Sequence, residues 1–201
     1  MIIKDKETLR ALYGEPGSRA SKKIMARLDV HSKHFIRLSP FMMLATYDEQ
    51  GRVDLSPRGG QPGFVLCPDD ETLVIPDAKG NNRVDSLINI VETGRAASLF
   101  LLPGIDETLR INGAAHITTD DAVLDLFPEE RYRLKSCIVL KVEEMFMHCA
   151  KALMRSQLWD SSRHTAREDF PSMGQILKDQ LGMQGAAESH EDMVKRYQPD
   201  L

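Results

Sequence analysis

The pattern of apolar and polar residues changes twice along the chain. In residues 1–40, apolar residues recur at helical spacing and Pro40 ends the last run, which predicts a helical N-terminal extension. From Phe41 onward, short apolar or alternating runs are separated by turn residues, a pattern typical of β-strands. After Cys149 helical spacing returns, so we expect residues 150–201 to form a helical C-terminal segment.

The central part of the chain contains seven short runs that we interpret as strands. Turns, and not long helices, separate most of them, which favours a small antiparallel barrel over a doubly wound sheet. Gly113 lies inside one run, where a bulge or a close backbone approach is expected. Two helices interrupt the series, at 82–92 with an apolar stripe and at 120–127 with Asp120 as its cap. The expected strands are 41–48, 52–57, 63–67, 72–76, 96–103, 107–119 and 135–149.

Length and composition indicate a single globular domain spanning residues 1–201. A chain of 201 residues with 42% hydrophobic and 28% charged residues can bury a real core. The N-terminal extension is too short to enclose a core of its own, so we expect it to be a helical preface and not a separate domain. The predicted fold class is therefore mainly β with peripheral helices.

Charge and the lack of targeting patterns limit the classes of partner. A formal net charge of −4 argues against broad nucleic-acid binding, which needs a basic face. The sequence has neither a membrane-length apolar run nor a signal-peptide core after Met1, so we expect a cytoplasmic protein without membrane contact. Its three cysteines lack CxxC spacing, which predicts reduced, mostly buried thiols and no structural zinc site.

The stretch 76-PDAKGNNRVDSLINI-90 has the features of an anion site. Asn81 or Asn82 could cap a helix that starts here, with its free N–H groups and partial positive charge directed outward. Arg83 adds a planar cation suited to phosphate, and Gly80 allows close backbone approach. A plain turn with a solvated arginine fits the same residues equally well.

Two further arginines stand near the ends of predicted strands. Arg58, in 56-SPRGGQPG-63, lacks the lysine and helix of a nucleotide P-loop, but it could converge with Arg83 on one phosphate or lie exposed in a loop. Arg110 is either an inward functional cation or an outward strand residue paired with Glu107 or Asp106.

The junction 148-HCAKALMRSQLW-159 crowds several reactive side chains together. His148 and Cys149 are adjacent on a strand and point to opposite faces, so they form neither a metal pair nor a nucleophile pair. Lys151 and Arg155 are four residues apart and share a helix face, where they bind an anion or are solvated. Trp159 adds an aromatic surface one turn further on.

Together these segments resemble the pyridoxamine 5′-phosphate oxidase superfamily of split β-barrel flavoproteins, in particular its FMN-binding branch. The resemblance spans roughly Ser39 to Trp159 and rests on four stretches in this order. They are 41-FMMLATYDEQGRVDLSPRGG-60, 75-IPDAKGNNRVDSLINI-90, 104-GIDETLRINGAAHIT-118 and 148-HCAKALMRSQLW-159.

The resemblance implies a homodimer with FMN at the subunit interface. Arg83 matches the arginine that binds the FMN phosphate, and Arg58 matches a basic strand-end position that faces the flavin. Backbone groups of Pro57 and Gly59 would lie near the flavin ring, and Ser86 could add a hydrogen bond to the phosphate. Lys151, Arg155 and Trp159 resemble the C-terminal elements that complete the pocket. The implied cofactor-binding residues are Pro57, Arg58, Gly59, Asn82, Arg83, Ser86, Lys151, Arg155 and Trp159.

Departures from the oxidase pattern leave the substrate open. The oxidase has an Arg-Lys pair where this chain has Arg83 and Val84, and its C-terminal substrate motif is not recognisable. We therefore expect an FMN-dependent oxidoreductase with an unassigned small-molecule substrate and no assigned catalytic side chain. The alternatives are a non-catalytic flavin carrier or redox sensor, and a haem- or deazaflavin-binding barrel with His148 available to iron.

Overall fold

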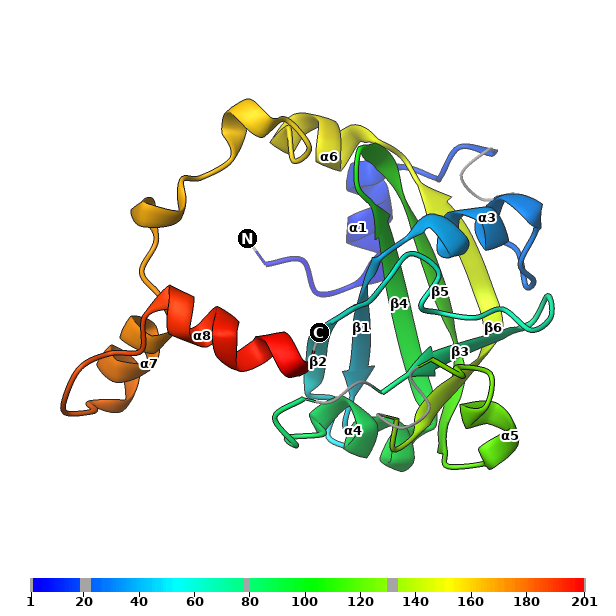
Figure 1. Ribbon diagram of the computed structural model, residues 1–201. Helices are drawn as coiled ribbons and strands as arrows, with labels where there is room; N and C mark the ends of the chain where they lie inside the picture. The colour runs from blue at the N-terminus through cyan, green and yellow to red at the C-terminus, as the bar shows by residue number, and fades with distance from the viewer. Residues whose placement is uncertain (1, 19–22, 78–79, 130–133, 201) are drawn as a thin grey trace. The chain divides into compact units, whose positions relative to one another are not determined.

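The computed structural model describes residues 2–18, 23–77, 80–129 and 134–200 (Figure 1). The chain forms two compact units, Met1–Arg155 and Ser156–Leu201, and each is described on its own. The organisation of residues 1–201 as one domain stays a prediction.

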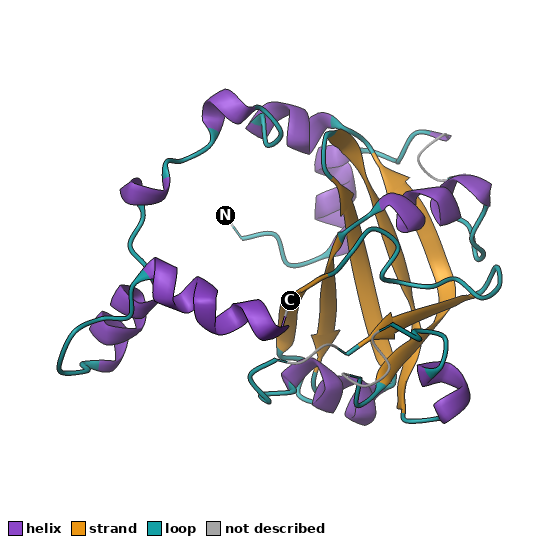
Figure 2. Ribbon diagram, viewed as in Figure 1, coloured by secondary structure: helices purple, strands orange, loops and turns teal. Residues whose placement is uncertain are grey.

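A curled, antiparallel, six-stranded sheet forms the centre of the first unit (Figure 2). Its strand order is β2-β1-β4-β5-β6-β3, so β2 and β3 are the two edge strands. The predicted barrel-like, mainly β fold with peripheral helices is thus confirmed. The strands are β1 (Phe41–Tyr47), β2 (Val53–Gly59), β3 (Thr72–Pro76), β4 (Arg95–Leu102), β5 (Ile105–Thr118) and β6 (Cys137–His148).

The strand expected at 63–67 is wrong. This segment makes only an isolated bridge, between Leu66 and Val74 of β3. Phe64 and Val65 are buried in the core, which explains the apolar run that suggested a strand. Apolar character here reflects burial of a loop under the sheet and not a full ladder of backbone hydrogen bonds.

The irregularity expected at Gly113 is confirmed. The register between β5 and β6 shifts between Asn112 and Gly113, as at a β-bulge. A Cβ atom at Gly113 would lie 1.8 Å from the carbonyl oxygen of Lys141 on β6. The bulge therefore requires a residue without a side chain, because the two backbones meet there.

The edge strand β2 directs polar side chains toward the core side of the sheet. On β1, Met42 and Leu44 are fully buried in the main core, as an inward face should be. Their register partners on β2 are Arg58 and Ser56, so polar side chains of the edge strand lie on the core side. Leu55 on the same strand is 61% exposed on the opposite face. On β2, polar side chains therefore face the core and apolar side chains face outward, which is the reverse of a strand that closes an apolar core.

The N-terminal extension forms helices α1 (Lys6–Tyr13) and α3 (Val30–Leu38), as predicted. The helix expected after residue 120 is α5 (Asp121–Leu124), and Asp120 caps it by accepting from the N–H of Ala122. After β6, the chain continues into α6 (Lys151–Ser156).

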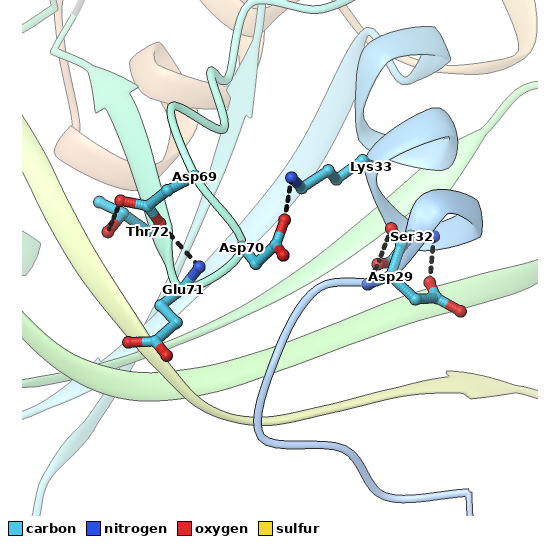
Figure 3. Close-up of polar contacts among 7 residues, drawn as sticks. All are labelled: Asp29, Ser32, Lys33, Asp69, Asp70, Glu71 and Thr72. Carbon is cyan, nitrogen blue, oxygen red and sulfur yellow. Dashed lines mark hydrogen bonds and ion pairs between the residues drawn. The ribbon is translucent and has the colours of Figure 1, made fainter.

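A capping box starts α3 and polar contacts surround it (Figure 3). The Asp29 carboxylate accepts from the N–H of Ser32 at 2.7 Å, and the Ser32 hydroxyl accepts from the N–H of Asp29 at 2.8 Å. One turn further on, Lys33 forms an ion pair with Asp70 in the loop before β3. In that loop, Asp69 accepts from the N–H of Glu71 and the hydroxyl of Thr72, which fixes the turn into the strand.

We expect Asp29→Ala to lower the free energy of unfolding by about 1 kcal/mol at neutral pH, because α3 loses its cap. The N–H of Ser32 lowers the pKa of Asp29. A carboxyl with a lowered pKa stabilises the fold above its unfolded pKa, and this contribution is lost as the pH falls through the folded value. The difference between variant and parent in urea melts should therefore shrink in acid.

Asp5→Ala is the matched control for this prediction. Asp5 caps α1 in the same way, through the N–H of Thr8, but α1 buries no residue. Its loss should leave the unfolding free energy of the whole protein unchanged. Equal losses of unfolding free energy in the two variants would contradict the role of Asp29 as the stabilising cap of α3. A loss for Asp29→Ala that grows in acid would contradict it as well.

The second unit consists of short helices. The 3-10 helices are Ser161–Arg163, Arg167–Asp169 and Gln198–Asp200, and the α-helices are α7 (Met173–Leu181) and α8 (His190–Tyr197). Neither α7 nor α8 contains a buried residue. Among the described residues of the whole chain, no helix has the length and apolar character needed to cross a membrane.

Candidate functional site

Helix α4 (Asp85–Thr93) begins later than the sequence predicts and without a side-chain cap. Its N-cap residue is Val84, so the expectation that Asn81 or Asn82 caps the helix is wrong. The Asn81 side chain instead accepts a hydrogen bond from the N–H of Arg83 at 3.1 Å, and Asn82 has a φ of 60°. The asparagines build the turn that leads into the helix.

The backbone at Val84 is strained. Val84 has a φ of 51°, in the left-handed region that a β-branched residue rarely adopts. Strain of this kind persists where the surrounding structure imposes it, and it is concentrated at binding sites. Since no side chain in the described residues caps α4, its first N–H groups stay available to an anion at the positive end of the helix dipole.

A buried polar network holds the start of α4 against the sheet. The Ser86 hydroxyl donates to Asp54 of β2 at 2.6 Å and lies 3.0 Å from the hydroxyl of Ser56. One turn along the helix, the Asn89 amide donates to the hydroxyl of Thr46 on β1 at 3.0 Å. These contacts join the start of α4 to the first half of β2. The convergence of Arg58 and Arg83 on one phosphate stays a prediction.

The buried face of α4 is more polar than the sequence suggested. Ser86 and Asn89 are buried beside Ile90, whereas Ile88 and Val91 of the predicted apolar stripe are 48% and 74% exposed. The helix therefore packs with its polar side toward β1 and β2, where Asp54 and Thr46 satisfy its hydrogen bonds.

Arg58 lies two residues beyond Ser56, on the same side of β2. Its Nη1 atom is 3.2 Å from Oδ1 of Asp77, and the two side chains are only 22% and 18% exposed. The Nε atom of Arg58 is buried without a hydrogen-bond partner in the described residues. A buried guanidinium donor without an acceptor is the kind of group that a bound anion would satisfy.

Arg83 differs from Arg58 in its exposure. Its side chain is 74% exposed, and its Nε and Nη2 atoms both lie near Oδ2 of Asp85, at 2.9 and 2.8 Å. Both arginines that the sequence assigned to phosphate are therefore paired with an aspartate. The neighbours of Arg58, Pro57 and Gly59, are exposed on the edge strand.

Helix α6 carries two of the predicted C-terminal site residues. Lys151 and Arg155 are exposed on α6, and the Nε of Arg155 donates to the carbonyl of Lys151 at 3.0 Å. Helix α6 follows the end of β6, whereas α4 leads into the start of β4, so the two helices lie at opposite ends of the sheet (Figure 1). Trp159 belongs to the second unit. Within the first unit, Lys151 and Arg155 are thus not brought to Arg58 and Arg83.

The chain matches the sequence profile described as "Pyridoxamine 5'-phosphate oxidase" over residues 28–149, more than half of its length. It belongs to the pyridoxamine 5′-phosphate oxidase family. The matched region contains the whole sheet and α4, and therefore includes Arg58, Arg83 and Ser86.

Solved structures agree with the fold of this family. HupZ from Group A Streptococcus matches with a TM-score of 0.50 at 21% identity, covering 60% of this chain and 93% of that chain. A variant of the same protein matches with a TM-score of 0.51 at 21% identity, covering 60% and 99%. At this identity the likeness shows the fold alone. No curated protein matches the chain.

The third arginine of interest in this oxidase-family chain faces outward. Arg110 forms an ion pair with Glu144 of β6, so both partners expected from the sequence, Glu107 and Asp106, are wrong. The guanidinium carbon also lies 4.2 Å from the ring centroid of Phe146. Glu144 was missed because it is 34 residues away in sequence, and only the register of β5 with β6, which pairs Glu144 with Asn112, brings it diagonally across from Arg110.

Two side chains that could carry chemistry, Cys67 and His148, are held in their neutral forms. Burial raises the pKa of the Cys67 thiol to about 11, which keeps it protonated and unreactive, and Cys149 is exposed rather than buried. Burial, followed by the nearby Arg110 and Lys23, lowers the pKa of His148, so its imidazole is neutral at physiological pH. In the described ranges, no three potential metal ligands cluster together.

Proposed function

We propose that this chain binds FMN and is an FMN-dependent oxidoreductase of the pyridoxamine 5′-phosphate oxidase family acting on a small molecule. Two observations carry the proposal: the uncapped, strained start of α4, and the buried, unsatisfied Nε of Arg58, which lies two residues along β2 from the Ser56 that contacts Ser86. Those two features fit a phosphate group, which needs several donors and a positive field.

The residues around α4 would hold the phosphate end of the cofactor. The first N–H groups of α4 and the guanidinium groups of Arg58 and Arg83 are the donors, and the Asn82 turn presents them. Ser86 is fully engaged with Asp54 and Ser56, so its role is to fix the start of α4.

The edge strand β2 would face the flavin ring. Pro57 and Gly59 flank Arg58 and are exposed, so their backbone groups are open to a planar ligand beside the strand. When bound, FMN supplies hydride transfer at its ring, and the chain contributes binding, orientation and polar donors.

We further propose that the active form is a homodimer, with the outer face of the sheet at the interface. Across β2, β1 and β4, this face carries apolar side chains in register, among them Leu55 opposite Ala45, which is opposite Ala97. Tyr47 and Val53 extend the row and are 43% and 79% exposed. A contiguous exposed apolar surface of this kind indicates a partner.

A hollow of about 350 Å³ lies in the same face. Small residues, including Ala45, Ala97 and Gly113, line it. A second copy of the chain could fill this hollow with side chains of its own. The C-terminal residues Lys151, Arg155 and Trp159 would then complete the FMN pocket of the partner.

We expect Leu55→Asp to convert the dimer into a monomer, because a carboxylate would have to be buried without a partner in the apolar interface. Light scattering after size-exclusion chromatography measures the change. Val30→Asp is the control, since Val30 is 73% exposed on α3 and not on the sheet. A monomeric parent, or a dimer that Leu55→Asp leaves intact, would contradict the proposed interface.

The visible absorption spectrum of the purified protein, with and without added FMN, tests the cofactor. Twin flavin bands are expected, whereas a Soret band would instead indicate haem. Rapid reduction of the bound flavin by NADH or NADPH, followed by substrate-dependent reoxidation, would support turnover. A bound flavin that no donor reduces would instead identify a non-catalytic flavin-binding module.

A further inference from the structure

The ion pair of Arg58 and Asp77 is the most enclosed ion pair that the described residues form. Its side chains are 22% and 18% exposed, whereas in each of the other pairs among these residues at least one member is 37% exposed or more. Solvent screens an enclosed pair less than a surface pair, so this contact matters more for the energetics of the site.

The pair also connects the two edges of the sheet. Arg58 lies on β2, and Asp77 directly follows β3, at the other end of the strand order. The N–H of Asp77 donates to the carbonyl of Ser136 at 3.1 Å, which fixes the backbone of Asp77. Asp77 is thus held by its own chain in a position that reaches Arg58.

Asp77 satisfies only part of the Arg58 guanidinium. The contact is a single one, between Nη1 and Oδ1, and not the two parallel bonds of a fork. The Nε of Arg58 stays buried without a partner in the described residues. An anion with three oxygens, such as a phosphate monoester, can use donors that the carboxylate of Asp77 leaves unsatisfied.

Resting on the proposed function, we propose that Asp77 is an affinity-determining residue that competes with the phosphate group of the ligand for Arg58. A phosphate at Arg58 meets a fixed carboxylate next to it, or separates that carboxylate from its only cation in the described residues. Either event opposes phosphate binding. Asp77 therefore weakens the binding of any phosphate-bearing ligand while it keeps Arg58 in place without one.

The variant Asp77→Asn tests the charge of Asp77 while it nearly preserves the shape of the side chain. Asparagine retains an oxygen that can accept from Nη1 of Arg58, but it removes the negative charge. We expect Asp77→Asn to bind FMN about tenfold more tightly than the parent, the size of one charge–charge interaction that water largely screens. Riboflavin, which has the same ring without phosphate, should bind both proteins equally.

Asp70→Asn is the matched control. It also removes one carboxylate from an ion pair, that of Lys33 and Asp70, and so changes the net charge by the same amount. Asp70 precedes β3 and Asp77 follows it, so the length of a strand separates them. The FMN affinity of Asp70→Asn should equal that of the parent.

Fluorescence titrations with FMN and riboflavin, and thermal shifts with inorganic phosphate, measure these effects on the full-length protein. If the parent binds FMN and Asp77→Asn binds it equally or more weakly, the role of Asp77 is refuted and the proposed function stands. If neither protein binds FMN, the proposed function is lost. In that case, greater stabilisation of Asp77→Asn than of the parent by phosphate supports the competition, and equal stabilisation refutes it.

Discussion

Gly113→Ala is expected to lower the free energy of unfolding by at least about 3 kcal/mol. The new Cβ would lie 1.8 Å from the carbonyl oxygen of Lys141 and 3.3 Å from the amide nitrogen of Glu143. Both are backbone atoms of β6, so no side chain can turn away to make room. The two strands would have to separate along a ladder that runs from Thr108 to Thr118 on β5. Urea denaturation followed by circular dichroism measures the loss.

Gly17→Ala is the control, because a Cβ at Gly17 meets no atom within 4 Å. At such a site alanine costs nothing and restricts the unfolded chain, so stability should be unchanged or slightly higher. If Gly113→Ala unfolded at the same urea concentration as the parent, the bulge would not need the close approach of β5 and β6.

Arg58→Ala is expected to weaken FMN binding by about 2 kcal/mol, or about 30-fold, the scale of a hydrogen bond between charged groups. Riboflavin binding should change much less, because the lost contact is to phosphate. Arg83→Ala should have a smaller effect than Arg58→Ala, since solvent screens a side chain that is 74% exposed. Titration of flavin fluorescence gives all three comparisons.

Arg52→Ala is the matched control for the loss of a cation. Arg52 is also paired with an aspartate, Asp48, but it lies in the turn between β1 and β2 and its side chain is 80% exposed. The variant Arg52→Ala should bind FMN as tightly as the parent does. Equal FMN affinity of Arg58→Ala and the parent would remove Arg58 from the phosphate site.

The sequence predicted the strands well where short apolar or alternating runs were bounded by turn residues. The run from Phe41 was recognised as β1 because it is short and apolar and turn residues follow it, and in the structure its residues alternate between buried and partly buried. The run at 63–67 failed because burial of a loop also selects apolar residues, and a single-sequence pattern cannot separate the two causes. Gly113 was recognised because a glycine inside a strand usually marks a bulge or a close approach of two backbones.

The sequence identified the cations of the site but not the groups that control them. Arg58 and Arg83 stand out because an arginine beside glycine or asparagine at the end of an element is a local pattern. The aspartates that pair with these two arginines differ in their distance along the sequence. Asp85 is two residues from Arg83, whereas Asp77 is 19 residues from Arg58 and reaches it only through the curl of the sheet.

The cap of α4 was predicted wrongly for a related reason. Asparagine is a common N-cap, and the sequence offers two of them before the helix. The backbone instead adopts positive φ at Asn82 and Val84, so the helix starts after both asparagines. Nothing in the local pattern indicates that a valine would take this conformation, because its intrinsic preference opposes it.

The central claim is that the chain holds FMN by its phosphate, at the start of α4. The most direct test compares the dissociation constants of FMN and riboflavin for the unmodified protein in one titration series. We predict that FMN binds at least about tenfold more tightly, at one flavin per chain, because only FMN contacts the arginines and the helix start. Equal affinity for the two flavins, or no binding of either, would contradict the claim.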